Sequence, residues 1–159
     1  MPMEGIVETP SFTFRLERVR TIRARAEERA REALSSELRA RARDEAQLHD
    51  ALATVAAARD VGRAAATPGR TSAVDFLSAQ AYLERAERRR AEASLELSRR
   101  DAEVAARRQV LAAAARDRQA IDKLKERRRA EHDAEWARRS QNALDELALA
   151  IHRRGGPAA

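Results

Sequence analysis

The clearest pattern in the sequence is a seven-residue repeat in the second half of the chain. One series of positions falls seven apart and a second follows it by three residues, which is the spacing of the two core positions of a coiled-coil helix. Alanine at many of the second positions allows a partner helix to approach closely. The first series is Phe76, Leu83, Arg90, Leu97, Val104, Leu111 and Arg118; the second is Ala79, Ala86, Ala93, Arg100, Arg107, Ala114 and Ile121.

A weaker pattern of steps of three and four predicts an earlier helix over about residues 13–61. Apart from its larger apolar positions, the seam holds alanine and charged residues, so little apolar surface is available for a core; those positions are Leu16, Val19, Leu34, Leu38, Leu48, Leu52 and Val55. The later helix meets no strong breaker before Gly155 and is predicted over about residues 73–153.

The two patterns are separated by residues 62–72, which have the composition of a turn. Gly62 is able to end a helix, and Pro68 is followed by a glycine, as is typical of turns. Ser72 and Asp75 have the spacing of a capping box at the start of the second helix. Residues 1–11 and 154–159 are expected to be a flexible lead and a flexible tail.

A turn of this length favours antiparallel neighbours. We therefore expect an all-α fold, an antiparallel two-helix coiled-coil hairpin whose second helix is the longer. With the turn centred near residue 66 or 67, paired residues have numbers that sum to about 133. Leu16 then lies near Asp117 and Phe12 near Ile121, so the second helix beyond about residue 122 has no facing helix within the chain.

Composition narrows the possible functions. Charged residues make up 36% of the chain and aromatic residues 3%, which is typical of long helices rather than of a two-layer globule. Cysteine is absent and the three histidines are scattered, so we expect neither thiol chemistry nor a metal or cofactor site. No glycine-rich phosphate loop or catalytic arrangement occurs, which argues against an enzyme. Neither a signal peptide nor a membrane span is expected.

The net charge of +6 has a compositional origin, because nearly all of the cations are arginine throughout the chain. A nucleic-acid-binding basic helix is one alternative, since residues 127–129 are three consecutive arginines that suit phosphates. Glu126 and Glu131 interrupt that patch, and no nucleic-acid-binding fold is recognisable.

The segment KLKERRRAEHDAEWARR, residues 123–139, lacks a wide apolar stripe yet carries the only tryptophan of the chain. Its charge pairs at helical spacing support a solvated helix. Trp136, however, is expected to lie largely in water, and a tryptophan among arginines is typical of a binding surface. Leu144, Leu147, Leu149 and Ile151 form a second apolar patch, which either packs against Phe12 and Phe14 or docks on another protein.

Three segments resemble the FliJ family of flagellar export chaperones. FTFRLERVRTIRARAEERA (residues 12–30) is similar to the opening of the family, and AQAYLERAERR (79–89) to its Tyr-Leu motif after the turn. KLKERRRAEHDAEWARRSQNALDELA (123–148) is similar to its most characteristic stretch, although Trp136 is unusual there.

The resemblance implies a non-catalytic, monomeric stalk at the cytoplasmic face of the inner membrane. Its partners would be the hexameric export ATPase (FliI-like), the ATPase regulator (FliH-like), the cytoplasmic domain of the export gate (FlhA-like) and export chaperones. The equivalent stalk of a virulence-type secretion system and a generic tethering coiled coil are alternatives. Candidate ATPase contacts are Arg127, Arg128, Glu131, Trp136, Arg138, Arg139 and Gln141; candidate gate contacts are Leu48, Leu52, Phe76, Tyr82 and Leu83.

Overall fold

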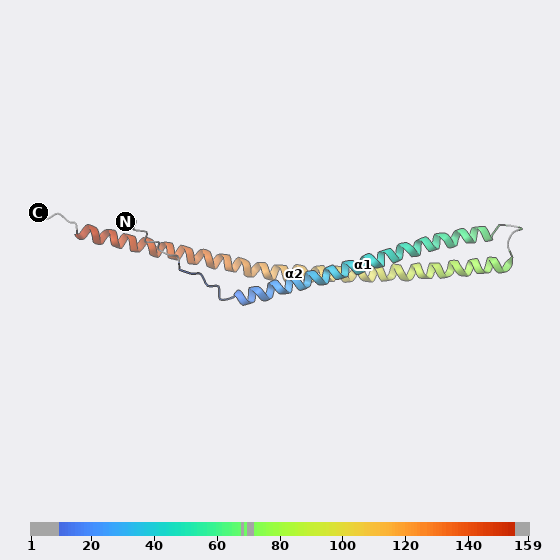
Figure 1. Ribbon diagram of the computed structural model, residues 1–159, viewed down its shortest axis with the longest axis horizontal. Coiled ribbons are helices and arrows are strands. Elements are labelled where there is room, and N and C mark those ends of the chain that lie inside the picture. Colours follow the sequence, from blue (N-terminus) through green and yellow to red (C-terminus); the bar gives the residue numbers. More distant parts are fainter. Residues whose placement is uncertain (1–9, 68, 70–71, 155–159) are drawn as a thin grey trace, which may run out of the picture. The chain divides into compact units, whose positions relative to one another are not determined.

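The protein consists of two helices that pack antiparallel, as the seven-residue repeat predicted. The structure, a computed structural model, describes residues 10–67, 69 and 72–154. Helix α1 spans Glu17–Ala65 and helix α2 spans Ala73–Arg154, so the second helix is the longer one (Figure 1). Within the described residues, neither helix has a stretch long and apolar enough to cross a membrane.

Helix α1 begins and ends about four residues later than the sequence predicted. At its start, the N–H of Glu17 donates to the carbonyl oxygen of Phe14 over 3.1 Å, and the carboxylate of Glu17 lies in the first turn, where the helix dipole favours it. At its end, Gly62 does not stop the helix. The helix runs on through Arg63 and two alanines to Ala65, because alanine is the strongest helix former and a cation in the last turn is favourable.

The predicted capping box begins α2. The Oγ of Ser72 accepts a hydrogen bond from the N–H of Asp75 over 3.2 Å, and the N–H of Ser72 donates to Oδ2 of Asp75 over 3.1 Å. The hydroxyl of Ser72 also donates to Oδ2 of Asp75 over 2.7 Å. This bond, together with the one from the N–H of Ser72, holds the pKa of Asp75 below its usual value. Gly69, in the turn, takes a φ of 83°, which favours glycine. The predicted lead and tail lie outside the described residues except for residues 10, 11 and 154, as does Pro68.

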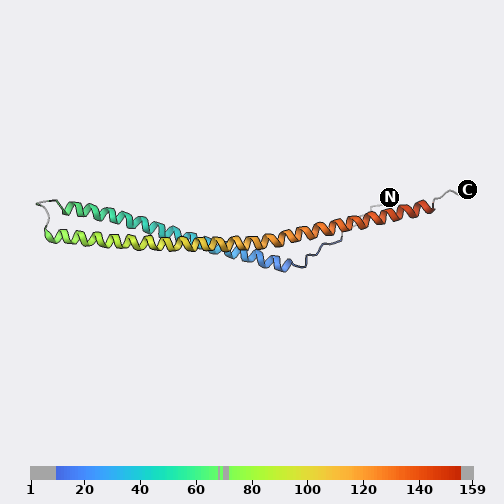
Figure 2. The ribbon, with the colours of Figure 1, turned by 180° about the vertical axis from the view of Figure 1, so that it is seen from behind.

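Tertiary contacts divide the chain into two units, one of residues 26–115 and one that joins residues up to Arg25 with residues from Arg116 onward. In the first unit, the cyan and green part of α1 runs beside the green and yellow part of α2, and the view from behind shows the same pairing (Figures 1 and 2). Val55, Ala58 and Ala86 form its buried cluster, and Tyr82 and Leu83 pack against them. The core is as thin as the composition predicted.

The seam of α1 differs in phase from the predicted one. Ala51 is buried, whereas Leu52 is 47% exposed. Both residues are one helical turn before Val55, so steps of three and four do not distinguish them in the sequence. The alanine packs inward because the facing seam of α2 is itself rich in alanine and allows close approach.

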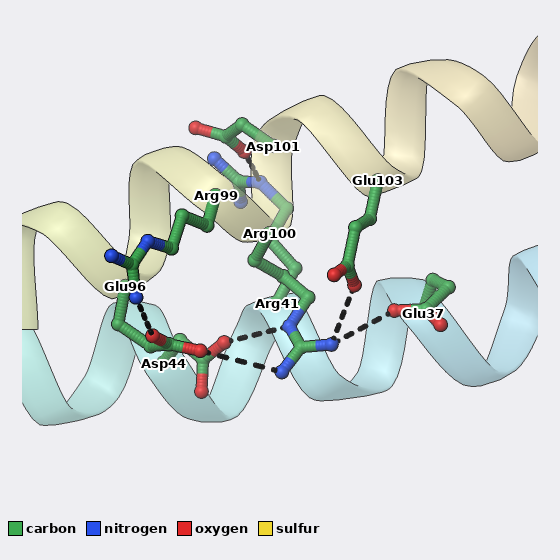
Figure 3. A network of polar contacts seen from close by, with 8 residues as sticks. All are labelled: Glu37, Arg41, Asp44, Glu96, Arg99, Arg100, Asp101 and Glu103. Atoms are coloured by element: carbon green, nitrogen blue, oxygen red, sulfur yellow. Dashed lines mark hydrogen bonds and ion pairs between the residues drawn. The ribbon is translucent and has the colours of Figure 1, made fainter.

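Ion pairs between α1 and α2 replace large apolar side chains along this seam (Figure 3). Arg100 takes the place of a core residue and donates to Asp44 over 2.9 Å and to Glu37 over 3.1 Å. These two contacts raise the pKa of Arg100 further above its usual value. Arg41 donates back across the seam to Asp101 over 2.6 Å. The pairing of the helices is thus specified by charge as well as by shape.

The register of the pair is shifted by about nine residues, or about two and a half helical turns, from the one predicted. Arg20 pairs with Asp122, whereas centring the turn near residue 66 placed Arg20 near residue 113. Part of the shift follows from the continuation of α1 to Ala65, which moves the centre of the turn toward residue 69. The rest of the shift arises because the alanine-rich seam packs similarly in several registers, so the ion pairs determine which one forms.

Candidate partner-binding surfaces

Residues 10–16, which we call the N-terminal strap, are not helical and reach back along α2. The ring of Phe12 lies 5.6 Å from that of His132 and 6.5 Å from that of Phe14. In both ribbon views, the trace leaves the blue start of α1 and reaches the orange part of α2 (Figures 1 and 2). The expectation that Phe12 lies near Ile121 is therefore wrong, because of the shifted register and because an extended residue advances about 3.3 Å where a helical one advances about 1.5 Å.

A groove of about 300 Å³ separates the strap from α2. Consecutive residues of the strap line one side of it and four residues of α2 line the other: Phe12, Thr13, Phe14, Arg15 and Leu16 on the strap, and Arg128, Glu131, His132 and Glu135 on α2. Both rings are half-buried. The strap thus rests on α2 with an apolar face and leaves space between them.

Ion pairs fix the start of α1 on α2 immediately after the strap. Lys125 Nζ donates to Glu17 Oε2 over 2.8 Å, and Arg20 Nε donates to Asp122 Oδ1 over 2.7 Å. The hydrogen bond from Lys125 holds the pKa of Glu17 below its usual value, and the bond from Arg20 does the same for Asp122. Asp122 and Lys125 therefore have partners on α1, although the prediction left the helix beyond about residue 122 without a facing helix.

The seven candidate ATPase contacts lie on α2, and most are engaged only within that helix. Arg128 pairs with Glu131 at 3.0 Å, Arg139 pairs with Glu135, and Gln141 donates to Asp145 over 2.9 Å. Arg138 donates to the carbonyl oxygen of Ala134 over 3.3 Å, and Arg127 is exposed. The charged side chains among them are exposed to solvent.

Trp136 is half-buried, although the sequence predicted that it would lie largely in water. It stands one turn beyond His132 on the same side of α2, so it continues the face on which the strap rests. Its position therefore links that face to the free end of the helix.

The final part of α2, residues 141–154, is exposed throughout. Leu144, Leu147 and Ile151 are 61%, 60% and 70% exposed and recur at helical spacing on one side. We call these three residues the terminal stripe; Leu149 falls on another side of the helix. The alternative that Phe12 and Phe14 pack on this patch is wrong, because the strap contacts α2 near His132 instead.

The five candidate gate contacts separate into two groups. Tyr82 and Leu83 pack against the buried cluster, and Leu48 is half-buried in the seam, whereas Leu52 and Phe76 are about half exposed. Beside Phe76, Val74 is 74% and Leu77 63% exposed. These two neighbours were missed in the sequence because they lie off the seven-residue repeat, although two exposed apolar residues at the start of a polar helix are a detectable signal.

Throughout the part of the chain that the structure describes, no three histidine, cysteine or acidic side chains are grouped so as to hold a metal ion. The acidic groups of the seams instead accept hydrogen bonds from arginine and lysine. Such an arrangement suits the binding of other proteins through exposed charges and apolar stripes.

Comparison with known families gives the flagellar FliJ protein, whose family model matches residues 12–157. Comparisons with curated proteins and with solved structures give no match. The matched range includes most of the strap, both helices and the terminal stripe. The chain therefore belongs to the flagellar FliJ family and is a non-catalytic component of the flagellar export apparatus.

Proposed function

We propose that the chain is a stalk that links the hexameric export ATPase, with its regulator, to the cytoplasmic domain of the export gate, and that it escorts export chaperones. It acts as a monomer at the cytoplasmic face of the inner membrane. The observation that carries this proposal is the free end of α2, where residues 141–154 present the terminal stripe to solvent. Three large exposed aliphatic side chains along one side of a helix favour an external partner.

The ATPase surface in this proposal runs from Arg127 to Ile151 on α2. It begins with exposed charges, passes Trp136 and ends with the terminal stripe. Arginine and tryptophan are the residues that most often dominate a protein interface, because they bring both area and directional hydrogen bonds. The aliphatic end supplies surface whose burial drives association.

The gate surface lies at the turn, in the other unit of the chain. Phe76 is 49% exposed there, and Val74 and Leu77 extend its apolar area. A pocket lined by Phe76, Leu77 and turn residues such as Thr67 and Gly69 adds a concave feature of about 500 Å³. Tyr82 and Leu83 pack against the buried cluster and therefore offer less to a partner.

The alternatives have less support. Binding to nucleic acid would use the arginines of α2, but Arg128, Arg129 and Arg139 each pair with a carboxylate of the same helix. Those carboxylates weaken the attraction for phosphate. The flagellar family match favours the flagellar apparatus over a virulence-type system and over a generic tether.

Truncation after Ser140 tests the ATPase assignment. The shortened chain loses the terminal stripe but keeps Asp122, Lys125 and His132, which contact α1 and the strap. A truncation after Ile121, which the sequence alone suggests, would remove those contacts as well and confuse folding with binding. We expect the chain that ends at Ser140 to stay helical by circular dichroism and to lose most of its affinity for the purified ATPase.

A matched control replaces Leu149, which lies outside the terminal stripe, with glutamine. That variant is expected to bind the ATPase as the wild type does, whereas Leu147→Gln weakens binding. Undiminished binding and stimulation of the ATPase by the chain that ends at Ser140 would refute the assignment of this surface.

A further inference from the structure

The strap covers part of the surface that is proposed to meet the ATPase. Arg128 and Glu131 are candidate ATPase contacts, and both line the groove that lies under Phe12 and Phe14. His132, which contacts the ring of Phe12, lies between Glu131 and Trp136 along α2. A partner that binds this face of the helix therefore contacts the strap as well.

The strap is attached more weakly than the helix that follows it. Among the described residues, no ion pair or side-chain hydrogen bond joins residues 10–16 to α2. The strap meets α2 through the ring of Phe12 on His132 and through the groove that both segments line. The ion-paired attachment begins only with Glu17 and Arg20. A segment without backbone pairing and with few apolar contacts opens at low free energy, even when the adjoining helix stays in place.

We propose that the strap is an autoinhibitory cover that rests on α2 in the free protein and lifts when the export ATPase binds. This inference rests on the proposed function, since it concerns the same face of α2. Covering this face lowers the apparent affinity in proportion to the fraction of molecules that are open. The ordered ion pairs after the strap keep α1 on α2 in both states, so that only residues 10–16 move.

A reversible crosslink provides the test. The chain has no cysteine, so Thr13→Cys and Glu135→Cys, both at the groove, introduce the only two thiols. A bis-maleimide with a disulfide in its spacer joins them and locks the strap, and reduction of that disulfide frees it again in the same protein sample. We expect the locked form to bind the purified ATPase with a Kd at least about tenfold higher than the reduced form.

A second variant releases the strap. Phe12→Ser with Phe14→Ser removes the apolar contact and is expected to lower the Kd severalfold, while circular dichroism stays unchanged. The outcomes distinguish a failure of the proposed cover from a failure of the ATPase assignment. If the wild type binds but the lock has no effect, the cover is refuted. If the release variant binds more weakly than the wild type, the cover is also refuted and the two rings belong to the contact surface. If neither the wild type nor the release variant binds, the ATPase assignment is wrong, and the proposal of a cover is refuted as well.

Discussion

Lys125 Nζ donates a hydrogen bond of 2.8 Å to Glu17 Oε2, so the first residue of α1 lies opposite residue 125 of α2. The helix pair therefore extends further along α2 than the length of the turn suggests. Beyond it, the strap contacts α2 as far as His132. Within the charged segment 123–139, Lys125 is paired with α1 and His132 meets the strap. This segment is therefore not without partners in the chain.

Exchange of charge across the pair tests this register. Arg20→Asp places two acidic groups together, because Arg20 faces Asp122, and is expected to lower the Tm in thermal unfolding followed by circular dichroism. Adding Asp122→Arg restores an opposite pair and recovers part of the loss. Should the double variant be less stable than either single one, the two residues would not face each other in solution.

Acid is expected to destabilise the helix pair. The pKa values of Glu17, Glu87 and Asp122 are lowered, chiefly because each accepts hydrogen bonds from arginine or lysine. Groups with lowered folded-state pKa values stabilise the fold at neutral pH, and that contribution is lost as pH falls below about 4. The Tm should therefore drop between pH 7 and pH 3, and Glu17→Gln should reduce the size of the drop. A Tm that rises on acidification would contradict these pairings.

Much of the fold was predictable because a seven-residue repeat constrains both the type of helix and the side that packs. The repeat in α2 identified Ala79, Ala86 and Val104, all of which are buried. The register was not predictable, because alanine side chains offer few shapes that distinguish one pairing from another. Ion pairs such as Arg100 with Asp44 decide it, and a sequence with so many charges offers several pairings of similar quality.

The candidate surfaces were predictable in part. Leu147 was recognised as exposed because its part of the helix was expected to have no facing helix, whereas Phe76 was assigned to the seven-residue repeat and is 49% exposed. The strap was not, since a helix was predicted from about residue 13 and Phe12 was placed near Ile121, whereas α1 begins only at Glu17. The half-burial of Trp136 was missed for the related reason that the pair was expected to end earlier.

Overpacking tests the close approach of the helices. Ala58 is 0% exposed in the buried cluster, so Ala58→Leu is expected to destabilise the fold by about 1–3 kcal/mol in urea unfolding. Ala57, its exposed neighbour on the same helix, provides the control, since Ala57→Leu should change stability by less than about 0.5 kcal/mol. Equal effects of the two substitutions would mean that α2 does not pack on Ala58.

The turn surface is tested by contrast between an exposed and a packed residue. Phe76→Ala is expected to weaken binding to the cytoplasmic domain of the gate without lowering the Tm, because half of its side chain faces solvent. Leu83→Ala removes a contact with the buried cluster and should lower stability by about 1–2 kcal/mol. Titration calorimetry with purified gate domain measures the first effect. Gate binding that survives Phe76→Ala and Leu77→Ala together would place the gate contact elsewhere.

The central claim is that one chain joins two partners through separate surfaces, and a bridging assay measures this directly. The cytoplasmic domain of the gate is immobilised, and retention of purified export ATPase is measured with and without the chain. We predict that the whole chain retains the ATPase on the immobilised domain. With the Phe76→Ala variant, retention of the chain and of the ATPase should fall together. The chain that ends at Ser140 should be retained, but without the ATPase. Equal retention of the ATPase in the presence and absence of the chain would contradict the account.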